Sequence, residues 1–297
     1  MTTPSDSQPQ AITRLRLLVT HGGKTRAPDF FGIGSEKCGT TWLWQMLRDH
    51  PETGVPQPKE LRYFSFRYLG TGLRNFETLE QLMTRPDRLR ANRKTLEQLA
   101  AELRITFGGD EAYKAIFGAM QEPCTGDISP QYCMLPDEGI AHMKTVAPDA
   151  RIIFLMRDPV SRLLSGAKMK AAEADPVLEE AAIRERTQNP FQLGMSRYSV
   201  MLDRFEAAFP GRVFTGFLDD IKTRPLGLLE DLCGFLGVSY DASYFPGLQK
   251  IANEGKSFEV GRALTLEAYA ALKDEYSLLA RRFPQKAAEW QAKYETL

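Results

Sequence analysis

The sequence has no excess of charge of either sign. Its 38 lysines and arginines balance 38 aspartates and glutamates, so bulk charge does not favour binding to nucleic acid or another polyanion. No stretch approaches the roughly 18 consecutive apolar residues of a membrane helix, and the N-terminal segment lacks the apolar core and cleavage site of a signal peptide. We therefore expect a soluble cytoplasmic protein that binds neither nucleic acid nor a membrane. The sequence does not indicate its oligomeric state.

Cysteine and histidine are also scarce. The chain has four cysteines, none of them in a CxxC pair: Cys38, Cys124, Cys133 and Cys233. Its three histidines lie far apart in the sequence: His21, His50 and His142. This spacing is not that of a zinc or other metal site, so we expect no metal. Four reduced thiols are favoured in a cytosolic chain, with a disulfide between Cys124 and Cys133 as the alternative.

What the sequence does contain is a glycine-bearing loop between an apolar run and a helix pattern, within residues 29–47. Gly34 and Gly39 have the glycine spacing of a Walker A phosphate loop, G-x-x-x-x-G-K-[ST]. The lysine is displaced, because Thr40 stands at the Walker position and the lysine comes earlier, at Lys37. The pattern predicts a phosphate loop, but not an ordinary NTP-binding one. The alternative is a strand–helix turn without a ligand.

The start of the following helix suits an anion. Its first N–H groups, over residues 39–42, lack intrahelical acceptors, and the helix dipole favours negative charge there. The side chains of Lys37, Thr40 and Thr41 add further donors. The loop is therefore expected to bind phosphate oxygens.

A second candidate anion site follows the clearest buried strand, residues 151–156, whose apolar run is typical of a covered parallel sheet. Arg157 comes directly after this strand, and Asp158 and Pro159 are a favourable N-cap and first residue for a helix that ends near residue 172. Ligands of open α/β sheets bind beyond the carboxyl ends of the strands, and guanidinium binds phosphate bidentately. An NTPase would have an acidic residue for Mg²⁺ at such a strand end. Two separated anion sites indicate a nucleotide with phosphates at two positions.

Strands alternate with helices along the chain, which predicts a three-layer α/β/α fold with a central, mostly parallel sheet. This is a P-loop-like nucleotide-binding arrangement. Further strands are expected at residues 125–130 and 213–217. Further helices are expected at residues 136–147, after residue 172 through 188, at 195–209 and 226–236, and twice at the C-terminus.

These motifs together resemble those of the sulfotransferases that use 3′-phosphoadenosine 5′-phosphosulfate (PAPS). The closest resemblance is to the branch of heparan sulfate and other carbohydrate sulfotransferases, in a bacterial-type form, and it runs from about Phe30 to Phe258. It implies that the first loop binds the 5′-phosphosulfate, that Arg157 and Ser165 bind the 3′-phosphate, and that adenosine 3′,5′-bisphosphate (PAP) is the product, with no metal. The residues that it implies at the donor site are Ser35, Lys37, Cys38, Gly39, Thr40, Thr41, Trp42, Arg157, Ser165, Tyr198, Gly255 and Lys256.

The resemblance also implies a catalytic pair. Residues 59–64 read KELRYF, similar to the K-E-x-x-F-F segment of glycan sulfotransferases, in which the glutamate is the catalytic base. Glu60 and Lys37 are therefore the expected catalytic residues. The alternative for Glu60 is a surface carboxylate paired with Lys59 or Arg62.

The expected reaction is in-line transfer of a sulfuryl group from PAPS to a hydroxyl or amine of a carbohydrate or small-molecule acceptor. Ile128 stands where the glycan enzymes have a lysine, and this departure weakens the case for a glycosaminoglycan acceptor. Two other functions stay open: a P-loop nucleotide kinase or NTPase, and a noncatalytic nucleotide-binding protein on the same fold.

The domain organisation is expected to be simple. Residues 1–26 are polar at their start and predict a flexible N-terminal segment, and residues 27–297 predict one sulfotransferase domain. Within it, residues 66–122 are expected to form a helical insertion on the acceptor side, because their pattern is largely helical and charged, without a strand signal. The alternative is a solvated helical cover.

Overall fold

Five parallel strands lie at the centre of the computed structural model, which describes residues 24–57, 59–70, 108–175, 177–248 and 258–297. Their order across the sheet is β2-β3-β1-β4-β5, and every pair of neighbours is parallel. The strands are β1 (Phe30–Gly34), β2 (Thr53–Gly54), β3 (Cys124–Ile128), β4 (Arg151–Met156) and β5 (Val213–Phe217). The sequence predicts all of them except β2, whose two residues are too few for a periodic pattern.

Helices connect and cover these strands. Their bounds are α2 (Thr40–Asp49), α3 (Tyr63–Leu69), α6 (Asp137–Val146), α7 (Pro159–Ala174), α8 (Glu180–Thr187), α9 (Pro190–Gly194), α10 (Tyr198–Ala208), α11 (Leu218–Thr223), α12 (Pro225–Leu236), α13 (Arg262–Ala280) and α14 (Pro284–Glu295), with 3₁₀ turns at Pro130–Met134 and Ala242–Tyr244. The helices predicted within the described residues are confirmed. The short helices α3, α9 and α11 are not predicted by the sequence, because tertiary packing rather than periodicity stabilises them.

Part of the expected organisation lies outside the described residues, namely residues 1–23 and residues 71–107 of the expected insertion. The end of that insertion, residues 108–118, is helical. Its Tyr113 stacks on Tyr63 of α3, with ring centroids 4.5 Å apart. The described end of the insertion therefore packs beside α3.

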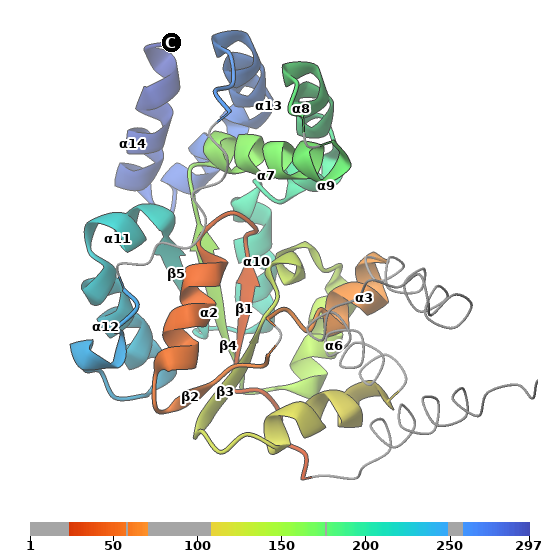
Figure 1. Cartoon of the computed structure of the whole chain (residues 1–297), viewed down its shortest axis with the longest axis vertical. Coiled ribbons are helices and arrows are strands. Elements are labelled where there is room, and N and C mark those ends of the chain that lie inside the picture. Colours follow the sequence, from red (N-terminus) through yellow and green to blue (C-terminus); the bar gives the residue numbers. More distant parts are fainter. Residues whose placement is uncertain (1–23, 58, 71–107, 176, 249–257) are drawn as a thin grey trace, which may run out of the picture.

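The helices form layers on both sides of the sheet. α2 covers one face and α10 the other (Figure 1), and α6 lies beside α10, where Arg204 Nε donates to Asp137 Oδ1 at 2.7 Å. α7, α8, α9, α13 and α14 gather beyond the carboxyl ends of the strands, at the top of Figure 1. The three-layer α/β/α fold is confirmed. Within the described ranges, no helix is long and apolar enough to cross a membrane.

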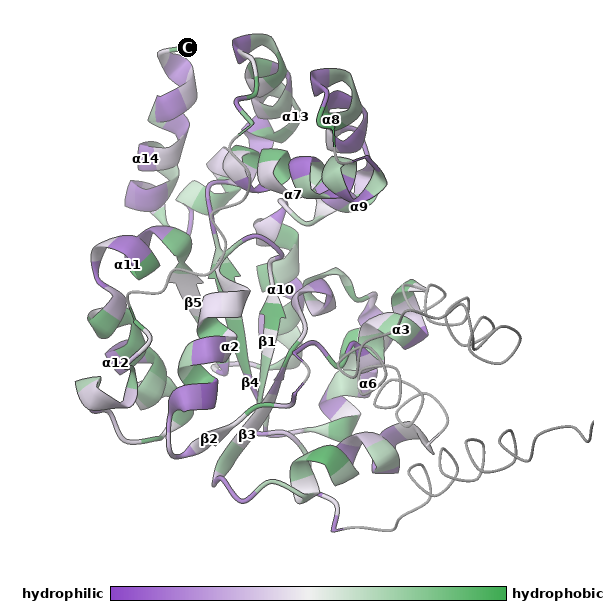
Figure 2. Cartoon of the chain, viewed as in Figure 1, coloured by the Kyte–Doolittle hydropathy of each residue, from purple (hydrophilic) through white to green (hydrophobic). Residues whose placement is uncertain are grey.

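The strands β1 and β4 are the apolar centre of the molecule. Every residue of β1 is buried, as is every residue of β4 after Arg151. Figure 2 shows the hydrophobic colour gathered in the central strands, while outer helices such as α8 and α14 carry much of the hydrophilic colour. A parallel strand covered on both faces must be apolar throughout, which is why these two strands are the easiest to predict.

The connections of β1 and β4 leave the sheet in opposite directions. In the chain, β1 is followed by β2 at one edge, whereas β4 is followed by β5 at the other. Adjacent strands with divergent connections are the topological switch point, where ligands of open α/β sheets bind beyond the carboxyl ends. Both predicted anion loops, which follow Gly34 and Met156, begin at this point.

The C-terminal helices are tied to the start of α7 through a buried carboxylate. Asp158 is the N-cap residue of α7, as predicted, but its side chain caps no N–H group of that helix. It accepts hydrogen bonds from the hydroxyls of Ser161 (2.5 Å), Tyr276 on α13 (2.6 Å) and Tyr294 on α14. Since Asp158 directly follows Arg157, this network holds the second anion loop in place.

We expect Tyr276→Phe to lower the free energy of unfolding by about 1–3 kcal/mol, because it removes a donor from a buried carboxylate. Tyr269→Phe is the matched control on α13, where the half-buried hydroxyl only accepts a 3.1 Å hydrogen bond from Gln291. Urea unfolding of both variants measures the difference. Equal losses in the two variants would contradict the role of Asp158.

Candidate functional site

The loop after β1 has an unusual backbone that explains its two glycines. Gly34 has φ 138°, and a Cβ there would lie 2.4 Å from the carbonyl oxygen of Pro130. Gly39 has φ 93°, and a Cβ there would lie 2.5 Å from Ile221 Cδ1 on α11. Between them, Lys37 has φ 70°, a left-handed conformation that is uncommon for a residue with a side chain. Packing against the protein, as well as the turn itself, requires these glycines.

The N-terminus of α2 is open to an anion. Gly39 is the N-cap residue, no side chain caps this end, and the first turn has no acidic residue. The first N–H groups of the helix therefore lack intrahelical acceptors, and the helix dipole favours negative charge beside them. Trp42 can contribute only its main-chain N–H group to an anion site, because its side chain is buried in the core.

Three of the predicted donor-site residues contact buried groups of the protein and support the loop. The Ser35 hydroxyl donates to the carbonyl of Met195 at 2.8 Å. Cys38 Sγ lies 3.6 Å from the hydroxyl of Tyr198, and both side chains are fully buried. Burial raises the pKa of the Cys38 thiol to about 11. The partners of these side chains all lie within the protein, so they fix the shape of the loop.

Three cations from three elements lie close enough for their charges to interact. Lys37 lies in the loop itself, Arg157 follows β4, and Lys168 lies on α7 one turn after Ser165. The pKa of Lys168 is lowered by burial and then by the charges of Arg157 and Lys37. Along the described ranges, no ion pair with a carboxylate is formed by any of the three. Their mutual repulsion would be relieved by an anionic ligand.

The sequence predicts two of these cations and misses the third. Lys168 belongs to no sequence motif. It could have been predicted from its position three residues after Ser165, because that spacing places both residues on one helix face. Its Nζ donates to the carbonyl of Phe258 at 3.1 Å. That residue follows the predicted Gly255 and Lys256, which lie outside the described residues.

Glu60 lies in a second strained segment. Glu60 and Arg62 both have left-handed backbones, with φ 70° and 56°. The Glu60 carboxylate pairs with Lys59 Nζ at 3.1 Å and with Arg62 at 2.8 Å. Burial raises the pKa of this carboxyl, but the two cations outweigh burial, so the pKa is lowered. Glu60 is therefore ionised at neutral pH.

Lys59 joins Glu60 to the phosphate loop. Besides Glu60, its Nζ contacts Thr40 Oγ1 at 3.3 Å and Thr41 Oγ1 at 3.2 Å, at the start of α2. The two predicted halves, the anion loop and the candidate base, thus belong to one site. Pairing of Glu60 with Lys59 and Arg62 is compatible with a catalytic role, since Lys59 also contacts the start of α2.

The strand β3 supports the Glu60 segment. The N–H group of Arg62 donates to Ser129 Oγ at 3.1 Å, and that hydroxyl donates to the buried carboxylate of Asp127 at 2.8 Å. Ile128 points the other way, and a Cβ on Gly32 would lie 2.9 Å from its Cγ1. Ile128 is therefore a core residue and brings no charge to the site.

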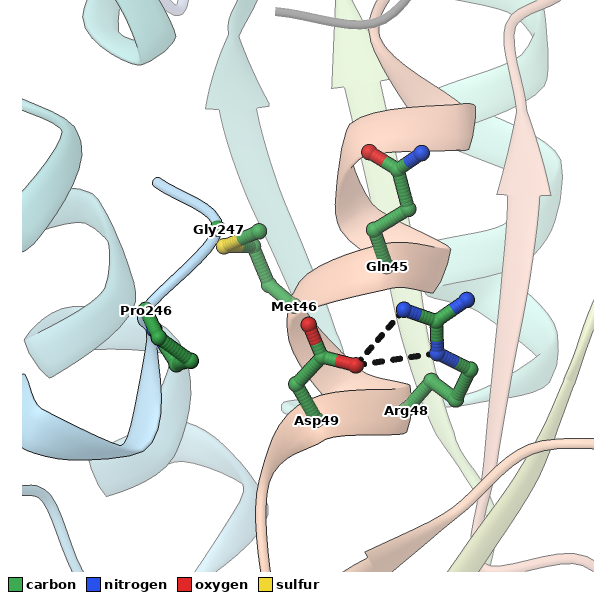
Figure 3. A pocket seen from close by; sticks show the side chains of 6 residues that line it. All are labelled: Gln45, Met46, Arg48, Asp49, Pro246 and Gly247. Atoms are coloured by element: carbon green, nitrogen blue, oxygen red, sulfur yellow. Dashed lines mark hydrogen bonds and ion pairs between the residues drawn. The ribbon is translucent and has the colours of Figure 1, made fainter. Parts of the chain in front are cut away.

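One pocket of the molecule lies elsewhere. It has a volume of about 280 Å³ beside the C-terminal half of α2, and Figure 3 shows its lining residues: Gln45, Met46, Arg48, Asp49, Pro246 and Gly247. Within this lining, the guanidinium of Arg48 donates two hydrogen bonds to Asp49 Oδ1. None of the predicted site residues lines this pocket, which sits at the opposite end of α2 from the phosphate loop.

Comparison with solved structures identifies the fold. A sulfotransferase from Alicyclobacillus acidocaldarius is 22% identical, with a TM-score of 0.59, and the match covers 90% of this chain and 99% of that one. The sulfotransferase domain of the Synechococcus PCC 7002 olefin synthase is 19% identical, with a TM-score of 0.55, and the match covers 89% and 97% of the two chains. The comparison with curated proteins found no match.

Residues 28–242 match the model of the sulfotransferase family. The chain belongs to this family. The sulfotransferase is therefore a transferase enzyme, as the sequence motifs predict. The finer resemblance to the heparan sulfate branch stays a prediction.

The four cysteines of this sulfotransferase are expected to resist alkylation at neutral pH. All are buried free thiols, so the alternative disulfide is not formed. Burial raises their pKa values to about 11 for Cys38 and Cys233 and about 12 for Cys124 and Cys133, and only the thiolate reacts. Mass spectrometry after iodoacetamide should find no adduct in the native protein and four in denaturant. Rapid native labelling of Cys38 would show that the loop opens.

Proposed function

We propose that this sulfotransferase transfers a sulfuryl group from PAPS to a hydroxyl or amine of a carbohydrate or small-molecule acceptor. Lys37 and Glu60 are its catalytic residues. The observation that carries the proposal is the uncapped N-terminus of α2, which follows the Lys37 loop and which Lys59 joins to the Glu60 carboxylate. Lys37 and Arg157 also act electrostatically on Lys168, and none of these three cations is paired with a carboxylate in the described part of the chain.

The donor site has the charges that such a nucleotide requires. The N–H groups at the start of α2, with Lys37, would hold the 5′-phosphosulfate. Arg157, Ser165 and Lys168 would hold the 3′-phosphate, since guanidinium and ammonium groups bind phosphate oxygens strongly. Two anion subsites on adjacent loops match a nucleotide with phosphate groups at two positions.

Catalysis would rest on positioning and electrostatics, by analogy with phosphoryl transfer. Lys37 neutralises the charge that develops on the leaving 5′-phosphate. Glu60, already ionised, accepts the proton of the attacking hydroxyl or amine. Because its pKa is lowered, the enzyme should stay active until the pH falls below the ordinary glutamate range.

The two other functions have weaker support. An NTPase has an acidic Mg²⁺ ligand at the strand end, where this chain has Arg157. The next residue, Asp158, is buried and its carboxylate accepts hydrogen bonds from Tyr276 and Tyr294. A noncatalytic nucleotide-binding protein has no use for a carboxylate such as Glu60 beside its phosphate loop, because that charge repels the ligand.

The test compares Glu60→Gln with Lys37→Ala. With PAPS and an acceptor library, Glu60→Gln should lose about 10²–10⁴-fold in turnover while keeping the PAP affinity of the wild type. Lys37→Ala should lose both turnover and affinity. Product mass spectrometry and thermal-shift titration with PAP measure the two quantities.

Three outcomes would contradict this proposal. Full activity in Glu60→Gln would remove Glu60 as the base. Preferential binding of ATP with Mg²⁺ over PAP would favour the kinase. Tight PAP binding without transfer to any acceptor would favour the noncatalytic protein.

Lys168→Met should weaken PAP binding by roughly tenfold or more, because a charge-assisted hydrogen bond is lost. Affinity for adenosine 5′-phosphosulfate, which lacks the 3′-phosphate, should not change. Since the pKa of Lys168 is lowered, PAP affinity in the wild type should fall as the pH rises toward the ordinary lysine range, and the variant should lack this decline. Calorimetry measures these affinities, with Lys170→Met as the control. Equal losses for both nucleotides would contradict the assignment.

A further inference from the structure

Lys59 stands between the two working parts of the proposed site. Its Nζ donates to three acceptors from two segments: the hydroxyls of Thr40 and Thr41 at the start of α2, and one carboxylate oxygen of Glu60. Its side chain is only 17% exposed. An ammonium group has three protons, so these contacts account for its full donor capacity.

The charge of Lys59 is not needed to neutralise Glu60 alone. The other carboxylate oxygen of Glu60 already accepts two hydrogen bonds from Arg62, at 3.2 and 2.8 Å. The two threonine hydroxyls are neutral, and their distances of 3.3 and 3.2 Å are long for hydrogen bonds of an ammonium group. Lys59 therefore has two weak partners that an anion could replace.

Lys59 also lies between the donor side and the acceptor side of the proposed site. Thr40 and Thr41 open α2, whose N-terminus favours an anion, and Glu60 is the proposed proton acceptor. A group that passes from a phosphate at α2 to an acceptor deprotonated by Glu60 must cross the space between them. The ammonium group of Lys59 borders that space.

We propose that Lys59 is a further catalytic residue, which binds the oxygens of the sulfuryl group during its transfer from the phosphate loop to the acceptor. This inference rests on the proposed function. Ile128, at the position where glycan sulfotransferases have a lysine, is buried against Gly32 and supplies no charge, whereas Lys59 contacts both the start of α2 and Glu60.

The step balances without a further reactant. The acceptor oxygen or nitrogen uses a lone pair to form the new bond to sulfur, and its proton passes to the Glu60 carboxylate. The bond between sulfur and the bridging oxygen breaks, and its electron pair stays on the 5′-phosphate of PAP. Lys59 keeps its proton throughout and stabilises the sulfuryl oxygens. Glu60 then releases the proton to solvent.

The coupling to Glu60 would assist this step. Lys59 and Arg62 hold the pKa of Glu60 below its ordinary value, which makes the carboxylate a weak base. As Lys59 turns to the sulfuryl oxygens, Glu60 loses part of this stabilisation and becomes a stronger base at the moment it is needed.

The experiment uses Lys59→Met, with Lys59→Arg as the conservative variant. The control is Lys170→Met, since Lys170 is a partly exposed lysine on α7 that pairs with Glu173 at 3.0 Å. Lys59→Met should lower kcat by about 10²–10³-fold, as expected for the loss of one group that stabilises transition-state charge. Its PAP affinity should match the wild type, because PAP carries no sulfuryl group. Lys59→Arg should recover part of kcat.

The pH profile gives a readout that a structural role would not move. Without Lys59, the pKa of Glu60 rises, so the acid limb of kcat/KM should shift to higher pH in Lys59→Met. The limb should stay in place in Lys170→Met. Retained PAP binding shows that the variant is folded.

Two results would overturn the assignment of Lys59 while the wild type is active. One is turnover in Lys59→Met equal to that in Lys170→Met. The other is a parallel loss of PAP affinity and kcat with an unmoved acid limb, which would make Lys59 a support of the phosphate loop. A wild type that forms no sulfated product from PAPS is a separate result, because it overturns the proposed function and this assignment together.

Discussion

Repulsion among three cations is the constraint on which this site depends. Lys37 and Arg157 follow the carboxyl ends of β1 and β4, and their charges disfavour the charged form of Lys168 on α7, in addition to its burial. The parallel pairing of β1 with β4 forces the first two together, because both loops start at the same sheet edge. A cluster of like charges destabilises the fold. Burial of the apolar strands offsets this loss of stability, and it does so whether or not a ligand is bound.

Buried polar contacts hold the two anion loops in place. Asp158 gathers hydroxyl donors from α7, α13 and α14 next to Arg157. Cys38 and Tyr198 meet under the phosphate loop. These groups are buried and bonded internally, so they act by fixing geometry. A transferase that works mainly by positioning and electrostatics needs such rigid support, because a small displacement of a charge loses much of its effect.

The Glu60 segment adds a second electrostatic balance. Its carboxylate would repel an anionic donor, yet it lies beside the anion loop because Lys59 and Arg62 compensate its charge. The left-handed backbones of Glu60 and Arg62 persist because Ser129 and Asp127 hold the segment from β3. Strain that surrounding contacts maintain at a cluster of charges is typical of a functional site. In this sulfotransferase, Glu60 and the anion loop are therefore parts of one arrangement.

The sequence alone determined the parallel sheet, most helices, the phosphate loop and the family, because apolar runs and glycine spacing are local signals. It also indicated Lys37, Arg157 and Glu60 through short motifs. Tertiary structure decided the rest. Only packing between elements turns Ile128 against Gly32 in the core and brings Lys59 to Thr40 and Thr41 at the start of α2. These contacts join different elements, and no local periodicity encodes a distance between side chains on different elements.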